Sequence, residues 1–138
     1  KPVAGISTLE ALAFRFRYLE GPIAPLIDAR RQQIYAAVYQ VDNSTLSIQQ
    51  PETVATPSDW LKQLEPGPYQ FVGDGVAHCR SAIMALHPGA RLLDTDNCIL
   101  SELCLLAYRR LVDGTTLSGE KIQANYLRPS DAKLNRRP

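Results

Sequence analysis

The sequence predicts an α/β protein whose mixed sheet is covered by helices on both faces. Two apolar runs, residues 23–27 and 34–41, flank a polar stretch and are rich in β-branched and aromatic residues, which favour strands. Both sides of each run are mostly apolar, so we expect helices above and below these strands. After a third strand, predicted helices and strands alternate, and strands joined in this way pair in parallel through right-handed crossovers. The expected order is β-β-β-α-β-α-β-α.

A helix precedes the first long strand. Ser7 and Glu10 have the spacing of a capping box, in which each residue satisfies a free N–H group at the start of a helix. Apolar residues then recur at helical intervals, which predicts a one-sided helix from Thr8 to about Leu19. The residues 20–22, Glu-Gly-Pro, end it.

The two apolar runs form a hairpin, and a third strand follows it. Residues 28–33 connect the first two strands and contain no glycine, which disfavours a two-residue primed turn. The third strand, residues 46–55, is interrupted by Pro51, which lacks the N–H group that a central ladder needs. We therefore place this strand at the edge of the sheet.

Two further strands and three helices are predicted downstream. Thr56, followed by proline, has the residue types of a helix start, and Trp60 on that short helix is expected to anchor the core. The remaining elements are the strands 69–72 and 90–94 and the helices 77–86 and 99–112. We expect Asp96 or Asn97 to cap the last helix and Gly114 to end it.

Composition and charge indicate one ordinary globular domain. The chain has 138 residues, 45% of them hydrophobic, and a formal net charge of +1, which gives no general attraction to nucleic acid. No apolar run approaches the ~20 residues that span a membrane. Cys79, Cys98 and Cys104 have neither the spacing of a disulfide framework nor that of a metal site. We expect three buried, unreactive thiols and a reducing cytoplasm.

One turn has the residue types of a phosphate-binding loop. Gly73, Asp74 and Gly75 lie between a predicted strand and a predicted helix, where backbone N–H groups can bind phosphate. Position 78 is histidine where the full dinucleotide pattern needs glycine, and no Walker-type lysine follows. Asp74 would also repel a phosphate. These three residues are therefore weak candidates for a cofactor site, and we favour a structural turn.

Asp28 is the carboxylate that lies next to a buried strand. We favour a structural role, in which Asp28 caps the turn or pairs with Arg30 or Arg31. The sequence contains neither a zinc-type histidine pair nor a Gly-x-Ser-x-Gly nucleophile motif. We therefore expect no cofactor, no metal and no complete catalytic site.

Five short motifs occur in order along the chain. They are GISTLEALA at 5–13, IDAR at 27–30, IY at 34–35, VGDG at 72–75 and YLRPS at 126–130. Together they resemble the second half of proteins of the TsaB/YeaZ family, and the resemblance covers nearly the whole chain. It implies a single actin-like, ribonuclease H-like half, in which the first hairpin can carry an acidic contact to a metal or a phosphate, here Asp28. One departure is Gln33, where the resemblance leads us to expect glutamate.

The resemblance also implies a division of the chain. Residues 1–20 would be the end of a strand and a connecting helix from a missing N-terminal half, and residues 21–138 the C-terminal actin-like domain with a flexible tail. The chain starts with Lys1 and has Met84 as its only methionine, which also leads us to expect part of a longer protein. A first helix without its natural cover would expose an apolar stripe, so we expect a homodimer.

In function, the resemblance implies a non-catalytic partner or scaffold subunit. It would act in the cytoplasm with a TsaD-like catalytic subunit and a TsaE-like ATPase to place threonylcarbamoyl on a tRNA adenosine, and would meet tRNA only indirectly. Asp28, Arg30, Tyr35 and Arg128, all within the motifs, are candidates for contact with a partner. Two alternatives stay open: the nucleotide-binding half of a kinase-like phosphotransferase, and an inactive peptidase-like homologue.

Overall fold

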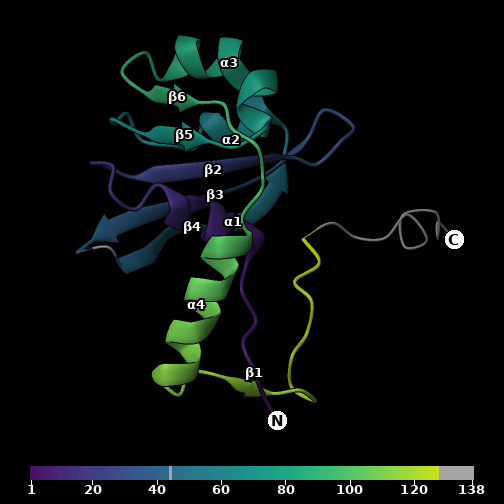
Figure 1. The fold of residues 1–138 in the computed structure, drawn as a ribbon. Helices are drawn as coiled ribbons and strands as arrows, with labels where there is room; N and C mark the ends of the chain where they lie inside the picture. Colours follow the sequence, from purple (N-terminus) through teal and green to yellow (C-terminus); the bar gives the residue numbers. More distant parts are fainter. Residues whose placement is uncertain (44, 128–138) are drawn as a thin grey trace, which may run out of the picture.

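A five-stranded mixed sheet forms the centre of the molecule (Figure 1). The computed structural model describes residues 1–43 and 45–127. The strands are β2 at Ile23–Asp28, β3 at Ile34–Asp42, β4 at Thr45–Ala55, β5 at Gln70–Val72 and β6 at Arg91–Leu93. They lie in the order β4-β3-β2-β5-β6; β2, β3 and β4 pair antiparallel, whereas β2, β5 and β6 pair in parallel. The predicted hairpin and the predicted parallel strands are confirmed.

Helices cover both faces of this sheet, as the sequence predicts. They are α1 at Thr8–Arg15, α2 at Pro57–Leu61, α3 at Gly75–Leu86 and α4 at Leu100–Val112. α1 and α4 lie on one face and α2 and α3 on the other (Figure 1), and each face has its own apolar core. Trp60 is 1% exposed, which confirms it as a core anchor. In the part of the chain that is described, no helix has the length and apolar character needed to cross a bilayer.

A second, two-stranded sheet lies at the far end of α4 (Figure 1). Its strands are β1 at Pro2–Val3 and β7 at Leu117–Ser118, which pair antiparallel. No pattern in the sequence indicates β7, because two residues are too few to show alternation. The pairing holds the start of the chain beside the segment that follows α4.

α1 starts directly after its predicted N-cap, Ser7, but it ends at Arg15 rather than near Leu19. Beyond Arg15 the backbone changes to short i→i+3 hydrogen bonds. The Arg17 guanidinium donates to the carbonyl of Phe14 at 2.8 Å and lies over the ring of the same residue. The same carbonyl accepts from the backbone N–H of Arg17 at 3.3 Å, so Arg17 closes the last turn through both its backbone and its side chain.

α1 is not the exposed helix that the sequence predicts. Leu9, Leu12 and Phe14 are at most 3% exposed, because both the sheet and α4 pack against them. Glu10, the capping-box residue, instead binds Arg110 of α4, whose Nη2 lies 2.8 and 2.7 Å from the two carboxylate oxygens. The expectation that this helix lacks a cover is therefore wrong, because α4 supplies the cover, whereas self-association of the chain stays a prediction.

β4 is an edge strand, as Pro51 predicts, but it is continuous rather than interrupted. Between the cross-strand pairs Ala36–Thr53 and Val38–Gln50, β4 advances by one residue more than β3. This β-bulge accommodates the proline, which has no N–H group to donate to the ladder. A bulge also redirects the side chains beside it, which matters for the site described below.

α4 begins without the predicted cap. Ile99 occupies the cap position and its side chain makes no capping bond, so neither Asp96 nor Asn97 has this role. Asp96 acts earlier, since its Oδ1 accepts from the N–H of Cys98 at 3.0 Å and from Nη1 of Arg15 at 3.2 Å. The Cys98 N–H and the Arg15 guanidinium hold the pKa of Asp96 below its usual range. Asp96 thus orders the turn before α4.

The prediction of three buried thiols is wrong for two of them. Cys79 lies in the core between α3 and the sheet and is 1% exposed, whereas Cys98 and Cys104 are exposed. Cys98 precedes α4, and Cys104 lies on the face of α4 that points away from α1. Nothing in the spacing of the three residues distinguishes these environments.

In dilute native protein at about pH 8, Ellman's reagent should modify two thiols quickly and Cys79 only after unfolding. Burial, with a smaller contribution from the charge of Asp28, raises the pKa of Cys79 to about 11 from its ordinary value of 9.0. Because the folded pKa is the higher one, Cys79 stabilises the fold below pH 9, and this contribution is lost as the pH rises towards 11. Fast modification of all three thiols would contradict the burial of Cys79.

Candidate functional site

The turn between β5 and α3 contains Gly73, Asp74 and Gly75, the candidate phosphate-binding residues. Gly73 has a φ of +110°, and a Cβ atom there would lie 2.4 Å from the carbonyl oxygen of Leu26 in β2. A Cβ atom at Gly75 would lie 2.9 Å from the carbonyl carbon of Leu26. Both glycines therefore let the start of α3 pack directly on the backbone of β2. This close approach explains the two glycines without a ligand.

Two carboxylates meet beside this turn. Asp74 Oδ1 accepts from the backbone N–H of Asp28 at 3.1 Å, and Asp28 Oδ1 accepts from the backbone N–H of Arg30 at 2.8 Å. The other oxygen of Asp28 lies 3.8 Å from Arg30 Nη1 and 3.9 Å from His78 Nε2. Asp28 thus caps the hairpin loop, in line with the favoured alternative. Two carboxylates near the start of α3 oppose the binding of a phosphate there.

The hairpin loop presents Arg30 to solvent in an unusual backbone conformation. Arg30, Arg31 and Gln32 have φ values of +61°, +52° and +58°, in the left-handed region that few non-glycine residues adopt. Two hydrogen bonds of 3.0 Å close the loop, from Ala29 N–H to the Gln33 carbonyl and from Gln33 N–H to the Arg30 carbonyl. The Arg30 side chain is 87% exposed. The loop is therefore a tight projection with a cation at its surface.

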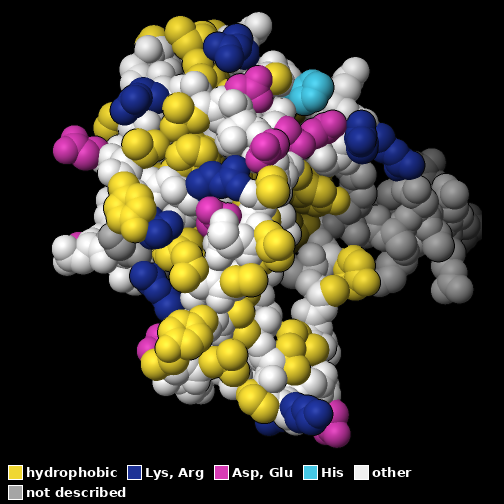
Figure 2. Space-filling model, in the orientation of Figure 1, with side chains coloured by type: hydrophobic (Ala, Val, Ile, Leu, Met, Phe, Trp, Pro, Cys, Tyr) yellow, Lys and Arg dark blue, Asp and Glu magenta, His cyan; other side chains and the backbone are white. Residues whose placement is uncertain are grey.

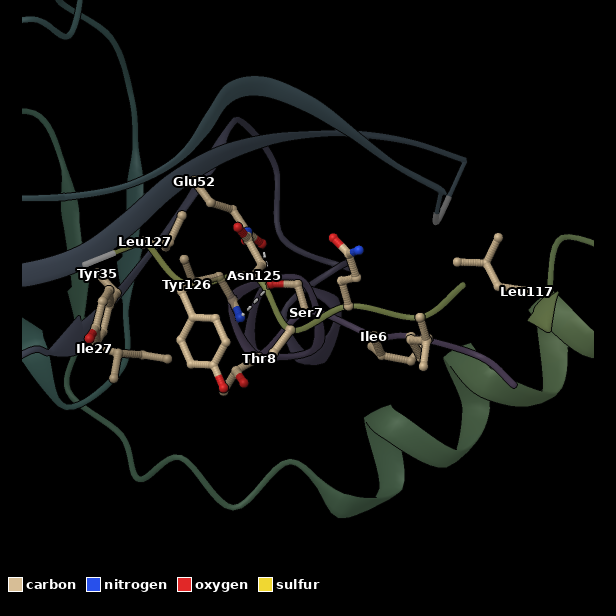
Figure 3. A pocket seen from close by; sticks show the side chains of 15 residues that line it. Ile6, Ser7, Thr8, Ile27, Tyr35, Glu52, Leu117, Asn125, Tyr126 and Leu127 are labelled. Carbon is tan, nitrogen blue, oxygen red and sulfur yellow. Dashed lines mark hydrogen bonds between the residues drawn. The ribbon is translucent and has the colours of Figure 1, made fainter. Parts of the chain in front are cut away.

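A groove of about 850 Å³ lies between the start of α1, the β2–β3 hairpin and the segment that follows α4 (Figure 3). Its lining comprises residues 5–9, Ile27, Tyr35, Glu52, Leu117 and residues 122–127. The walls are mostly apolar. Tyr126 is 87% exposed and Tyr35 is half-buried, so two aromatic rings are accessible from solvent at the groove.

Glu52 joins four parts of the structure in this groove (Figure 3). Its Oε1 accepts from the hydroxyl of Ser7 at the start of α1 and from that of Tyr39 in β3, the latter at 3.0 Å. Its Oε2 accepts from Asn125 Nδ2 at 2.9 Å. Burial, followed by the charge of Glu52, raises the pKa of Tyr39, so the phenol stays a donor. In the sequence, the one feature that could have indicated this role is that the Glu52 carboxylate directly follows Pro51.

The predicted contact residues lie in two places. Asp28 and Arg30 lie at the hairpin loop beside Asp74, whereas Tyr35 lines the groove. Arg128 lies outside the described residues. Within residues 1–43 and 45–127, no group of three His, Cys, Asp or Glu side chains could hold a metal ion. The β2–β3 hairpin thus contributes to both places, with Ile27 and Tyr35 in the groove and its loop at the surface.

Comparisons with known proteins show which family this chain belongs to. The family model of TsaD, the tRNA N6-adenosine threonylcarbamoyltransferase, matches residues 1–121. The chain belongs to this family. The tRNA threonylcarbamoyladenosine biosynthesis protein TsaB of Bacillus subtilis strain 168 is 38% identical over 74 residues, which are 52% of this chain and 32% of that protein. The TsaB/YeaZ resemblance carried by the motifs is thereby confirmed.

Two solved structures from Pseudomonas aeruginosa share the fold. One is an uncharacterized protein with similarity to peptidase YEAZ, with a TM-score of 0.69 and 22% identity over 93% of this chain. The other is YeaZ, with a TM-score of 0.67 and 23% identity over 91% of this chain. Both confirm the actin-like, ribonuclease H-like α/β fold of the TsaD family. The chain spans 60% of each of these structures and about a third of the Bacillus protein.

Proposed function

We propose that the chain acts in the biosynthesis of threonylcarbamoyladenosine in tRNA, as a non-catalytic partner or scaffold subunit. It would work in the cytoplasm with a TsaD-like catalytic subunit and a TsaE-like ATPase. The observation that carries the proposal is the match to the TsaD family over residues 1–121, together with 38% identity to TsaB. Contact with tRNA would be indirect, which agrees with a formal net charge of +1.

The non-catalytic role is supported by how the carboxylates of the site are used. Glu52 accepts three hydrogen bonds from side chains of its own chain, and Asp28 and Asp74 each accept one from the hairpin backbone. A general base or metal ligand needs free oxygens that face a substrate. Glu52 uses both of its oxygens for structural hydrogen bonds, and Asp28 and Asp74 each use one.

The surface proposed for the catalytic partner is the hairpin loop with the adjacent groove. Arg30 projects from the loop, and Tyr35 and Tyr126 offer accessible rings beside it. Arginine and tyrosine are the residue types that contribute most at protein interfaces, because they combine large contact areas with directed hydrogen bonds. An acidic and aromatic surface on the partner would complement this one.

The test is genetic and uses the gene in its own cells. Deletion should remove threonylcarbamoyladenosine from total tRNA, measured by nucleoside mass spectrometry, and the wild-type gene should restore it. The variant Asp28→Asn should restore it to within about twofold, because an amide oxygen can still accept from the loop N–H. Arg30→Glu should weaken capture of the TsaD-like subunit about tenfold, whereas Arg91→Glu, an exposed arginine on β6, should not.

Three outcomes would contradict the proposal. An unchanged threonylcarbamoyladenosine content of tRNA after deletion would show that this biosynthesis does not need the chain. A loss of more than about 100-fold in modification with Asp28→Asn, at normal protein level, would indicate a catalytic carboxylate. Calorimetric binding of magnesium ATP to the isolated chain would favour the kinase-like alternative, which the Asp28 and Asp74 carboxylates oppose. The peptidase-like alternative has only structures under 25% identical behind it, and these show the fold alone.

A further inference from the structure

Two arginine side chains lie over one buried ring where α1 packs against α4. The guanidinium carbon of Arg17 is 4.0 Å from the centre of the Phe14 ring, and that of Arg109 is 4.9 Å from it. The Arg17 guanidinium also lies 4.3 Å from the centre of the Tyr18 ring. The negative face of an aromatic ring attracts a cation, so these contacts hold both arginines in place. We call Phe14, Arg17, Tyr18 and Arg109 the arginine–aromatic cluster.

The two positive charges of this cluster are not neutralised. Among the described residues, Arg17 and Arg109 form no ion pair with a carboxylate, whereas the neighbouring Arg15 and Arg110 do. Both guanidiniums lie near the same ring centre, so the two charges are within about 10 Å of each other, which is one Debye length at 0.1 M salt. They therefore repel each other, and a bound anion would remove this repulsion.

Arg17 is held in one orientation and still has N–H groups to donate. Its Nη1 donates to the carbonyl of Phe14 at 2.8 Å, and its Nη2 donates to the hydroxyl of Tyr18 at 2.7 Å. Each of these nitrogens carries two N–H groups, so each has a second one for an acceptor from outside the chain. Because the side chain is already ordered, binding an anion would cost little further conformational entropy.

Exposed tyrosines accompany the two arginines. Tyr18 is 74% exposed, and Tyr108, which precedes Arg109 in α4, is 66% exposed. Figure 2 shows Lys and Arg side chains interleaved with hydrophobic ones along the left of the view, from the sheet down to α4. Arginine and tyrosine are the residue types that contribute most at the centres of protein interfaces. The cluster thus has the composition of a binding surface as well as a cover for Phe14.

We propose that the arginine–aromatic cluster binds an acidic segment of another protein, in which two carboxylates pair with Arg17 and Arg109. Two glutamates one turn apart on a helix have this reach, since their Cβ atoms are about 6 Å apart and their side chains are flexible. Complementary charges of this kind select the partner and fix its register. The proposal is independent of the role in tRNA modification, because it uses neither the hairpin loop nor the groove.

An RNA backbone is the other polyanion that arginines and tyrosines can bind. It needs a row of cations, because each phosphate contact adds its own share of the affinity. Beside the cluster, however, the cations are paired: Arg15 Nη1 lies 3.2 Å from an oxygen of Asp96. Arg110 Nη2 lies 2.7 Å from an oxygen of Glu10. The carboxylates of these pairs would repel an RNA backbone that followed the two helices, so the charges favour a protein.

NMR titration of the 138-residue chain with a synthetic peptide tests this proposal. The peptide has about 18 residues, enough to form a helix, with glutamate pairs four positions apart; the matched peptide has glutamine in their place. The glutamate peptide should shift the backbone signals of Arg17 and Tyr18 and bind at least about tenfold more tightly than the glutamine peptide. Arg109→Glu should weaken its binding at least about tenfold, because the charge reversal replaces an attraction by a repulsion. The matched control, Arg80→Glu, changes an exposed arginine on α3, across the sheet, and should weaken binding less than about twofold.

Three results would overturn the proposal. The first is the absence of shifts at Arg17 and Tyr18 in about 1 mM peptide, or equal affinity for the two peptides. The second is an equal loss of affinity with Arg109→Glu and Arg80→Glu, which would show attraction to net charge alone. The third is tighter binding of a single-stranded RNA of about 12 nucleotides than of the glutamate peptide, lost with Arg109→Glu, which would assign the cluster to nucleic acid. Because Arg17 also closes α1, the substitutions are placed at Arg109, which is exposed and outside that turn.

Discussion

Gly73→Ala should be among the most destabilising single-methyl changes in this chain, with a loss of more than about 3 kcal/mol in the free energy of unfolding. Two costs add. A φ of +110° lies in a region that side chains rarely adopt, and the new Cβ would lie 2.4 Å from the carbonyl oxygen of Leu26. The oxygen belongs to the backbone of β2 at the centre of the sheet, so it has little room to move. Urea unfolding followed by Trp60 fluorescence measures the loss.

Gly89→Ala is the matched control for this prediction. A Cβ atom at Gly89 meets no atom within 4 Å, and its φ lies outside the left-handed region. The change should be neutral or stabilising by up to about 1 kcal/mol, because alanine restricts the unfolded chain. Equal losses for the two variants would show that α3 does not approach β2 closely, and the glycines of the turn would then need another explanation.

Where the fold was predictable, the signal was local. The apolar runs of β2 and β3 identify strands buried on both faces, and the pair Thr56 and Pro57 identifies the start of α2, whose N-cap Thr56 accepts from Asp59 N–H at 3.4 Å. Pro51 identifies the sheet edge, because a missing N–H excludes a central strand. Each of these signals depends on residues that are near one another in the chain.

The Glu52 cluster was not predictable, because its members are far apart in the sequence. Ser7 is 45 positions from Glu52 and Asn125 is 73 positions away. Glu52 itself lies at the bulge in β4, between Gln50 and Thr53, and bulges leave no periodic pattern. The candidate residues that the sequence did identify belong to one hairpin, so Asp28, Arg30 and Tyr35 are neighbours for a local reason.

The same distinction explains the errors about α1 and α4. A helical stripe shows which face of a helix is apolar but not which element covers it. α1 is an example: its apolar stripe is present as predicted, but the sequence does not show that α4 covers it. In α4, apolar residues recur on more than one side of the helix, and only the packing of Leu103 and Leu106 shows which side faces the core.

Glu52→Ala should cost about 2–4 kcal/mol of the free energy of unfolding, well above the cost of removing one exposed hydrogen bond. The reason is Tyr39, whose side chain is buried and whose hydroxyl would lose its acceptor. Asn125→Ala is the matched variant on the other side of the carboxylate. It removes only the contact to the segment after β7 and should cost less than about 1 kcal/mol. That variant should instead speed tryptic cleavage after Lys121.

A double-mutant cycle with Tyr39→Phe isolates the buried contact. If the unpaired phenol is the main cost of Glu52→Ala, removing the Tyr39 hydroxyl as well should recover part of the lost stability. The free energy of unfolding of the double variant should then exceed the value expected from adding the two single losses by about 1–2 kcal/mol. Urea unfolding of the four proteins provides the numbers. Strict additivity would mean that Glu52 stabilises the fold through Ser7 and the start of α1, and the groove would then be held together from that side alone.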